Sequence, residues 1–329
     1  MAVMPVYAQS SVVIFGTVDV GVGVASTNGR TKAVSRASGI NPSRLGLRGS
    51  EDLGDGYSTA FWIEGGLDPD VGTQGGSNGT ANAFWNRRST LSLATPAGEI
   101  RLGRDYTGVF SNMADFDPAN TNGSGSSTIL WSYLGSNAVT NVRANNTVSY
   151  TTPNLEGLSG QLMVSPSEGL DGQRYRGARL TYYRERLRLA AATSETIAGP
   201  LPGGIYRTTN LAASYKFDGV LIEGFTNKYA YGPRRAIDLL VGVVVPIGRV
   251  EFHGSYQVLN AYGAGTGAND ARQLFVNLTY VASKNTALYL NFSRLRNEGA
   301  ASYAMPNAPL SPQGAFTNRG AEAGIRHFF

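Results

Sequence analysis

The chain has 329 residues, no cysteine, 42 glycines and 17 tyrosines, and only 16% of its residues are charged. Without cysteine, a disulfide framework and thiolate metal sites are excluded, and a disordered chain would carry fewer aromatic residues and more charge. The net charge is +5, and all 28 basic residues are arginine except Lys32, Lys216, Lys228 and Lys284. Because they are scattered singly, without a basic tail or a known motif, a nucleic-acid binder is disfavoured.

The sequence contains no candidate transmembrane helix, which requires about 18 apolar residues in a row. Its longest apolar stretch, residues 239–247, is interrupted by Gly242 and Pro246. Any membrane crossing must therefore use strands closed into a barrel. Val6-Tyr7-Ala8 resembles a signal-peptidase cleavage context. We expect residues 1–8 to be the end of a secretory signal or an added start, and residues 9–329 to form one domain; the alternative is an ordinary flexible N-terminus.

Apolar and polar residues alternate with period two along the whole chain. Val18, Val20 and Val22 share one face of the first segment, whereas Thr17 and Asp19 share the other. The same alternation recurs at residues 44–48, 88–93, 186–189, 237–245, 250–256 and 288–292. The segments run to about ten residues, as in membrane barrels, whereas strands of soluble sheets average about 5–6. Aromatic residues near segment ends indicate interfacial girdles: Tyr57, Tyr150, Tyr182, Tyr215, Phe217, Tyr229, Tyr256 and Tyr280.

The connections between segments alternate between short and long. Residues 51–56, 96–98 and 217–219 are short and rich in turn formers, whereas residues 68–81, 112–127, 261–269 and 297–317 are long and rich in Gly, Ser, Asn and Thr. Seven short turns and eight long loops give sixteen strands with both termini on the short-turn side. The predicted fold is a sixteen-stranded antiparallel transmembrane β-barrel with short periplasmic turns and long extracellular loops.

Alternation also assigns residues to the two faces of the barrel wall. An arginine facing lipid at the midplane costs about 2–4 kcal/mol, whereas a water-filled lumen accepts it. The arginines predicted to face inward are Arg44, Arg48, Arg88, Arg101, Arg143, Arg179, Arg186, Arg188 and Arg326. The predicted inward acids are fewer: Asp19, Glu64, Glu251 and Glu322. Arg87 would replace Arg88 if the register slipped by one residue.

Several ordered motifs resemble the Gram-negative general porins. They are residues 43–54 (SRLGLRGSEDLG), 61–64 (FWIE), 87–93 (RRSTLSL), 98–105 (GEIRLGRD), 143–150 (RANNTVSY) and the closing 324–329 (GIRHFF). The pattern is most similar to the anion-selective porins of beta-proteobacteria and extends over the whole chain. The strand-like end of the chain at Phe329 is interpreted as a signal for the barrel-assembly machinery.

The resemblance implies a homotrimer in the Gram-negative outer membrane. It also implies that a third loop, residues 106–141, folds into the lumen after the fifth strand and narrows the pore. Arg44, Arg88 and Arg143, together with Arg101, would line this constriction opposite Asp115 and Asp117. The Pro-Glu-Phe-Gly signature of enterobacterial porins is absent from this loop, so the resemblance does not fix its path.

A ring of arginines acts as an anion filter, so the sequence predicts a channel for passive diffusion of small hydrophilic solutes with a preference for anions. Expected partners are small anionic solutes, outer-membrane lipid and lipopolysaccharide; no cofactor and no nucleic acid is expected. A channel tuned to a dicarboxylate or to phosphate remains an alternative, as do an adhesin and an outer-membrane enzyme.

The histidines argue against the enzyme. His253 lies beside Glu251 on an inward face, and His327 falls in the outward phase near the end of the chain. Neither spacing supplies the partner that a catalytic histidine requires. Asp68 and Asp70 could bind a surface calcium ion, but a solvated loop is the favoured explanation, and no metal site is predicted.

Overall fold

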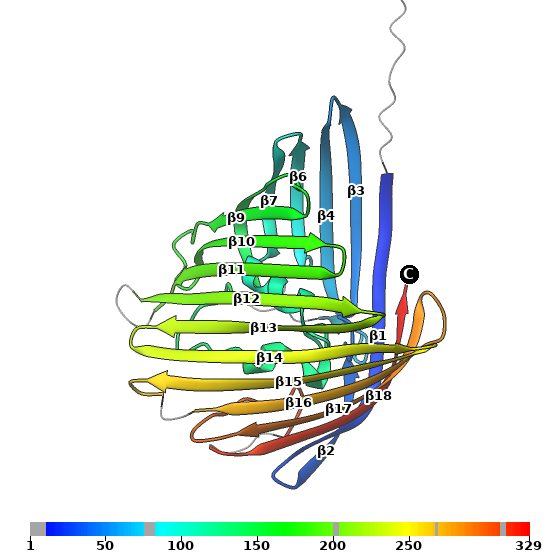
Figure 1. Ribbon diagram of the computed structural model, residues 1–329, viewed down its shortest axis with the longest axis vertical. Helices are drawn as coiled ribbons and strands as arrows, with labels where there is room; N and C mark the ends of the chain where they lie inside the picture. Colours follow the sequence, from blue (N-terminus) through cyan, green and yellow to red (C-terminus); the bar gives the residue numbers. More distant parts are fainter. Residues whose placement is uncertain (1–10, 76–82, 200–203, 267–268, 310–313) are drawn as a thin grey trace, which may run out of the picture.

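The computed structural model describes residues 11–75, 83–199, 204–266, 269–309 and 314–329, which form one antiparallel sheet closed on itself (Figure 1). Its strands are β1 (Ser11–Thr27), β2 (Arg30–Ala37), β3 (Arg44–Gly54), β4 (Tyr57–Asp68), β5 (Thr73–Gln74), β6 (Arg88–Thr95), β7 (Gly98–Tyr106), β8 (Arg143–Thr151), β9 (Leu158–Ser165), β10 (Arg174–Arg184), β11 (Leu187–Ile197), β12 (Ile205–Phe217), β13 (Val220–Tyr231), β14 (Arg234–Ile247), β15 (Val250–Gly263), β16 (Ala271–Val281), β17 (Thr286–Asn297) and β18 (Thr317–Phe328).

The described strands make a barrel of sixteen, as predicted. Strands β2 and β3 both pair with β1 and together form one barrel strand in two parts. The two-residue strand β5 pairs with the end of β4 and is not counted as a barrel strand. The barrel closes between its first and last strands, with Thr17 opposite Phe328 and Thr27 opposite Asn318. Closure leaves no open sheet edge, so strand hydrogen bonding is satisfied within the wall.

Two connections at the long-loop end are shorter than predicted. Asn28 and Gly29 alone join β1 to β2, and Gly232 and Pro233 alone join β13 to β14. Asn28 and Gly29 both have positive φ, which is the conformation of a tight hairpin turn. Residues 23–37 thus continue the barrel wall as a hairpin, and the predicted count of eight long loops does not hold at these two connections.

The predicted alternation between an apolar outer face and a polar inner face is confirmed. Val22 and Leu91 point outward and are largely exposed, whereas Asp19 and Asn210 point inward and are completely buried. Tyr229 is an exception to the girdle prediction. It is buried on the inner face, where its hydroxyl donates to Asp238 Oδ2 at 3.1 Å.

The hydrophobic core lies inside the barrel. The connection between β7 and β8, residues 107–142 and hereafter the lumen loop, carries α1 (Gly108–Asp115) and the short 3-10 helices η1 (Gly123–Gly125) and η2 (Ser127–Leu130). Its apolar side chains pack in one cluster with inward residues of β11 to β14: Val109, Met113, Phe116, Leu130 and Trp131 from the loop, and Ala192, Tyr206, Phe225 and Leu240 from the wall. The third loop thus fills part of the lumen (Figure 1). Among the described residues, no helix is long and apolar enough to cross a bilayer.

Asp19 joins the break between β2 and β3 to the closing strands. Its carboxylate accepts hydrogen bonds from the backbone N–H groups of Gly39, Ile40 and Asn41 at 2.8 to 3.0 Å. The hydroxyl of Tyr289 in β17 donates to the same carboxylate at 2.7 Å. Asp19 is fully buried, so its carboxylate is the acceptor that satisfies these donors inside the protein.

We predict that Asp19→Ala lowers the free energy of unfolding by about 2–4 kcal/mol, because each buried donor left unsatisfied costs about 1–3 kcal/mol. The measurement is guanidinium unfolding in lipid bilayers followed by tryptophan fluorescence. Asp218→Ala is the control, since Asp218 is exposed in a turn and lies 3.5 Å from Arg186. An equal loss in both variants would contradict the proposed role of Asp19.

Candidate functional site: the pore constriction

The lumen loop follows the inner wall from β10 to β17. Helix α1 contacts β10, β11 and β12, and η1 contacts β16 and β17. Hydrogen bonds fix this path: Asn112 Nδ2 donates to Asn210 Oδ1 at 2.9 Å, and Gln273 Nε2 donates to the Ser124 carbonyl at 3.0 Å. The wall formed by β3 to β8 therefore lies across the lumen from the middle of the loop.

The loop is also held together by its own polar groups. Thr107 caps α1 by accepting from the N–H of Phe110 at 3.4 Å. Asp117 accepts from the N–H groups of Ala119, Thr121 and Ser127 at 2.9 to 3.1 Å. Burial raises the pKa of the Asp117 carboxyl, although these hydrogen bonds act in the opposite direction. Asp117 thus shapes the loop and is shielded from the open lumen.

Glycine lets the tip of the loop approach the wall closely. A Cβ atom on Gly123 would overlap the carbonyl oxygen of Gly39, and one on Gly125 would overlap the ring of Phe275. Gly123 also has φ +63°, which other residues adopt only with strain. These two glycines allow the loop to touch the β2–β3 break and β16.

A first charged network links three arginines of the open wall. Arg87 Nε lies 2.5 Å from Glu64 Oε1, and Arg44 Nε lies 3.9 Å from the same oxygen. The hydroxyl of Tyr106 accepts from Arg87 at 2.8 Å and from Arg143 at 2.6 Å. Arg143 also lies over the Tyr106 ring, with 4.3 Å from its guanidinium carbon to the ring centroid. Arg44, Arg87 and Arg143 are therefore positioned together by one acid and one tyrosine.

A second network lies beside the first. Asp105 Oδ2 accepts from Arg88 at 3.0 Å and from Arg101 at 2.9 Å. Arg101 also pairs with Glu99 at 2.8 Å. Arg88 stacks on Trp62, at 4.7 Å from the ring centroid, and Arg48 stacks on the same ring at 5.1 Å. Aromatic stacking orients the guanidinium groups without neutralising them.

Arg87 is the residue that strict alternation misses. It precedes β6, which begins at Arg88, so the alternation of the strand does not govern its side chain. The adjacent pair Arg87-Arg88 is the sequence feature that could have indicated a second arginine at this position. The structure connects Arg44 and Arg143 through Arg87, whereas Arg88 joins Arg101 in the neighbouring network.

The remaining predicted residues hold the loop or lie at the rim. Arg179 pairs with Asp115 at 2.5 Å and donates to Asn112 Oδ1 at 2.6 Å. Arg188 stacks on Tyr183 at 4.2 Å from the ring centroid. Together they anchor α1 to the wall. Arg186 lies outside any strand, in the short connection between β10 and β11, and is exposed.

In three ion pairs of this wall, the arginine side chain is more exposed than its acidic partner. The side chains of Arg44, Arg88 and Arg101 are 26%, 17% and 23% exposed, whereas those of Glu64 and Asp105 are 7% and 6% exposed. Glu99, at 27%, and Asp115, at 37% against 19% for Arg179, are exceptions. Acids beneath the lumen loop are covered as well, since Asp238 and Glu322 are buried.

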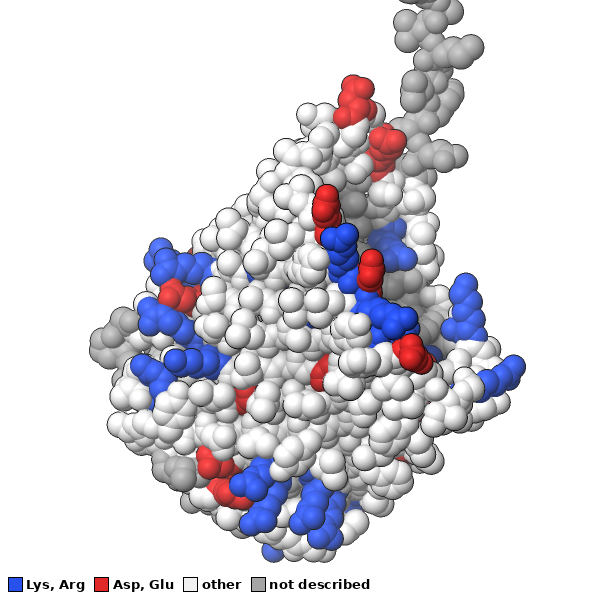
Figure 2. All heavy atoms as spheres, in the orientation of Figure 1, with Lys and Arg blue, Asp and Glu red and all other residues white. Residues whose placement is uncertain are grey.

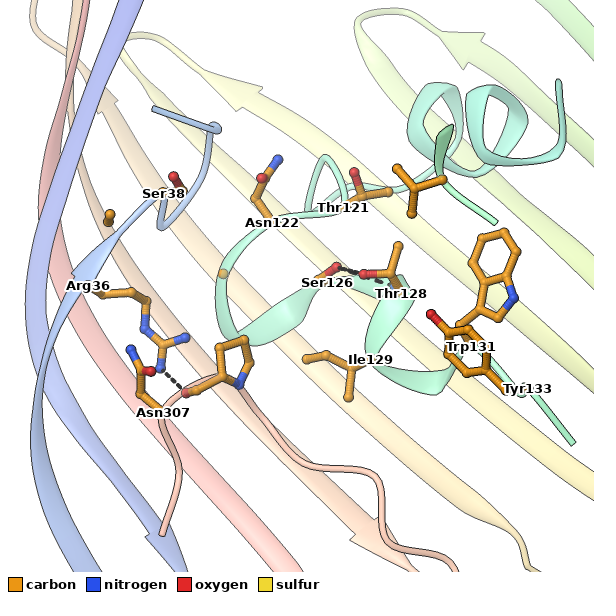
Figure 3. A pocket seen from close by; sticks show the side chains of 14 residues that line it. Arg36, Ser38, Thr121, Asn122, Ser126, Thr128, Ile129, Trp131, Tyr133 and Asn307 are labelled. Atoms are coloured by element: carbon orange, nitrogen blue, oxygen red, sulfur yellow. Dashed lines mark hydrogen bonds between the residues drawn. The ribbon is translucent and has the colours of Figure 1, made fainter. Parts of the chain in front are cut away.

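A cavity of about 450 Å³ lies between the lumen loop, β2 and residues 306–307 (Figure 3). Arg36 reaches it from β2, where its guanidinium pairs with Glu322 at 2.5 Å and donates to the Pro306 carbonyl at 3.0 Å. Trp131 lines the opposite side, and its indole N–H donates to the hydroxyl of Tyr206 at 2.8 Å. Tyr231 does not line this cavity; its hydroxyl donates to the Ala198 carbonyl at 3.1 Å.

The histidines and the chain end have structural contacts. His253 Nδ1 lies 3.0 Å from the Pro118 carbonyl oxygen, and its Nε2 lies 3.5 Å from Glu251. His327 faces outward beside Thr286. Phe329 exchanges backbone hydrogen bonds with Gly16 at the barrel seam. In the described part of the chain, no group of three or more His, Asp or Glu residues could hold a metal ion.

A closed barrel that is polar inside, apolar outside and partly filled by one loop is an outer-membrane channel. The Gram-negative porin family matches residues 2–300, so this chain belongs to that family. It is an outer-membrane porin, a channel rather than an enzyme.

Individual relatives agree with this assignment. Outer membrane porin protein 32 of Delftia acidovorans is 31% identical, with coverage of 98% of this chain and 95% of the relative. The solved anion-selective porin from Comamonas acidovorans superposes with a TM-score of 0.87 at 28% identity, covering 98% and 100% of the two chains. Salmonella typhi OmpF shares the fold, with a TM-score of 0.70 at 15% identity over 97% of each chain.

We predict that deleting residues 112–127 raises single-channel conductance, because this segment occupies lumen volume against β10 to β17. The measurement is conductance of the purified protein in planar bilayers. Deletion of residues 167–170, in the connection between β9 and β10, is the control and should leave conductance unchanged. Unchanged conductance after the lumen-loop deletion would mean that this segment does not narrow the pore.

Proposed function

We propose that this porin prefers small anions and that Arg44, Arg87, Arg88, Arg101 and Arg143 form the filter. The observation that carries the proposal is the difference in exposure between Arg44, Arg88 and Arg101 and their buried partners Glu64 and Asp105. An anion entering the constriction would meet the guanidinium groups of Arg44, Arg88 and Arg101, whereas Glu64 and Asp105 lie behind them. The similar porin from Comamonas acidovorans is anion-selective, which agrees with the proposal.

Charge balance along the open wall supports the same preference. The basic residues on the lumen side of strands β3 to β8 outnumber the acidic ones: they are Arg44, Arg48, Arg88, Arg101, Arg143 and, directly before β6, Arg87, against Glu64, Glu99 and Asp105. Several weak guanidinium sites in succession favour conduction, because one tight site would retain the ion. Asp115 and Asp117 act mainly on the loop, since Asp115 is neutralised by Arg179 and Asp117 is buried.

A channel tuned to organic anions is the second candidate. The cavity of about 450 Å³ brings Tyr133 and Ile129 close to Arg36, and this combination suits a carboxylate attached to an apolar group. Dicarboxylates and phosphate are therefore the test solutes. Concentration-dependent block of chloride current by an organic anion, but not by phosphate at equal charge, would favour this second function.

The proposed assembly and partners follow from membership of the family. We propose a homotrimer in the outer membrane, with small anionic solutes in the pore and lipopolysaccharide around the barrel. Phe329 is the proposed contact for the barrel-assembly machinery, and its exposed side chain at the seam with β1 leaves it accessible.

We predict that Arg143→Glu reduces the anion preference, because it reverses one charge in the network around Tyr106. Under a tenfold salt gradient in a planar bilayer, the reversal potential should fall by roughly half or more. Arg87→Glu should act similarly, whereas Arg143→Lys should preserve the sign of the potential.

Arg249→Glu is the matched control, because it makes the same charge change at an exposed turn between β14 and β15. If Arg143→Glu leaves the reversal potential unchanged, Arg143 is not part of the filter. If Arg249→Glu shifts the potential equally, the selectivity arises from overall charge rather than from the constriction.

A further inference from the structure

Two aromatic rings lie on the inner face of the barrel, in β1 and β4. Phe15 is two residues from the buried Thr17, and Trp62 is two residues from the buried Glu64, so alternation puts both rings on the lumen side, where they are partly exposed. Figure 2 shows that charged side chains on the outer surface gather near the strand ends and leave few charges in the band between them. Apolar rings belong on that lipid-facing band, so two of them in the lumen require a reason.

The two rings pack against each other over a glycine. Gly46 in β3 lies opposite Phe15, and a Cβ atom on Gly46 would overlap the Phe15 ring. The ring therefore lies over the backbone of β3 and meets Trp62 edge to face, with 5.1 Å between the ring centroids. The indole N–H of Trp62 donates to Glu64 Oε2 at 3.1 Å, which fixes the orientation of the indole. Phe15 and Trp62 thus form an ordered aromatic platform beside the open wall.

Arg48 lies against this aromatic platform. Its guanidinium carbon is 5.2 Å from the centroid of Phe15 and 5.1 Å from that of Trp62. Arg88 pairs with Asp105, whereas no ion pair of Arg48 is found among the residues that the structure describes. The side chain of Arg48 is also exposed. Stacking therefore holds this charge in place without neutralising it.

One side of the Arg48 guanidinium is open. The two distances from its carbon to the ring centroids and the distance between the centroids are nearly equal, so the three groups form a nearly equilateral triangle. Rings that enclosed the guanidinium from both sides would lie about twice as far from each other. Phe15 and Trp62 are therefore on the same side of the guanidinium, and its other side can accept a further planar group.

A second guanidinium group lies on the same indole ring. Arg88 is 4.7 Å from the Trp62 centroid, so the guanidinium carbons of Arg48 and Arg88 are separated by no more than the sum of their distances to that centroid. Along β3, Arg48 lies closer than Arg44 to the short turn that joins β3 to β4. One aromatic carboxylate ion can bridge from Arg48 to Arg88, with its ring on the first guanidinium and its carboxylate on the second.

We propose that Phe15, Arg48, Trp62 and Arg88 form a binding site for aromatic carboxylates on the short-turn side of the filter. The ring of the ligand stacks on the open side of Arg48, and its carboxylate accepts hydrogen bonds from Arg88. A guanidinium group can do both, because it stacks on aromatic faces and donates to carboxylates in its own plane. The site is separate from the cavity in Figure 3 and rests on the proposed anion filter only through Arg88.

Shape and charge together favour an aromatic carboxylate over other solutes. Chloride and phosphate would interact with both arginines but would leave the open side of Arg48 without a stacking partner. A saturated ring with a carboxylate could reach Arg88 but could not stack flat on Arg48. A neutral aromatic solute would stack on Arg48 but would bring no acceptor of equal strength for Arg88.

The test measures block of the chloride current through the purified protein in planar bilayers by benzoate and by cyclohexanecarboxylate, which have equal charge and similar size. Benzoate should block at a concentration about threefold lower or less, as expected for one added cation–π contact. Trp62→Leu and Arg48→Lys should each abolish this preference, whereas Trp62→Phe, which keeps a ring, should retain it. Because Arg48 is exposed, Arg48→Lys provides the test even if Trp62→Leu fails to fold.

Phe61→Leu is the matched control, because Phe61 precedes Trp62 in β4, faces outward opposite Leu91 and loses the same kind of ring. Its preference for benzoate should be unchanged. Equal block by the two ions in the unmodified protein overturns the proposal, and so does an unchanged preference in Arg48→Lys. Loss of the preference in Tyr133→Leu but not in Trp62→Leu would place the ligand in the cavity of Figure 3 and would also overturn it.

The reversal potential under a salt gradient is measured on the same channels. Arg48→Lys keeps the charge, so it should lose the preference for benzoate while the anion preference of the pore stays unchanged. If the unmodified protein prefers benzoate as a blocker but shows no anion preference, the aromatic site stands and the proposed filter fails. If the protein is anion-selective but does not distinguish the two carboxylates, the filter stands and the aromatic site fails.

Discussion

The packing of the lumen loop against the inner wall is the contact on which the pore depends. Sixteen tilted strands enclose more space than their own side chains fill, and the apolar residues of α1 and η2 occupy part of it. The inward faces of β11 to β14 are shaped for this contact, with Ala192, Phe225 and Leu240 beneath the loop. Removing the loop would expose apolar surface and buried acids together. The packing of the loop against the inner wall therefore both narrows the pore and stabilises the barrel.

This arrangement also separates the charges of the wall into covered and open parts. Asp238 and Glu322 lie beneath the loop and are hydrogen-bonded to Gln257 and Asn291. The arginines of β3 to β8 lie on the wall outside this packing, and Trp62 and Tyr106 orient them as well as acids do. The positive charges of such a wall would repel one another if no acids lay between them. Glu64 and Asp105 form ion pairs with these arginines, and both acids are largely buried.

Alternation in the sequence predicts the barrel and the faces of Arg44, Arg101 and Asp19, because lipid on one side and water on the other impose a period of two. The strand number came from the count of short and long connections. It fails where strands end. Arg87 precedes its strand, and Tyr229 lies near a strand end but points inward. The Asn28-Gly29 pair is a hairpin signal, yet the polar residues around it also suit a long loop.

Other features depend on the folded path of the chain. The role of Asp117 could not be predicted, because its three donors are brought together only by the turns of the loop. Cross-strand neighbours such as Arg294 and Arg319 depend on register, which composition does not reveal.

The contacts that hold the loop tip have a consequence for the order of assembly. Ser124 lies 3.4 Å from Glu322, a partner 198 residues later in the chain and within the last strand. Gln273, 149 residues after Ser124, also binds the tip. Contacts between such distant parts of a chain form late in folding, because a large loop must close first. The tip of the lumen loop can therefore reach its final position only when β16 and β18 are in place, so that an unfinished barrel lacks the loop path of the mature one.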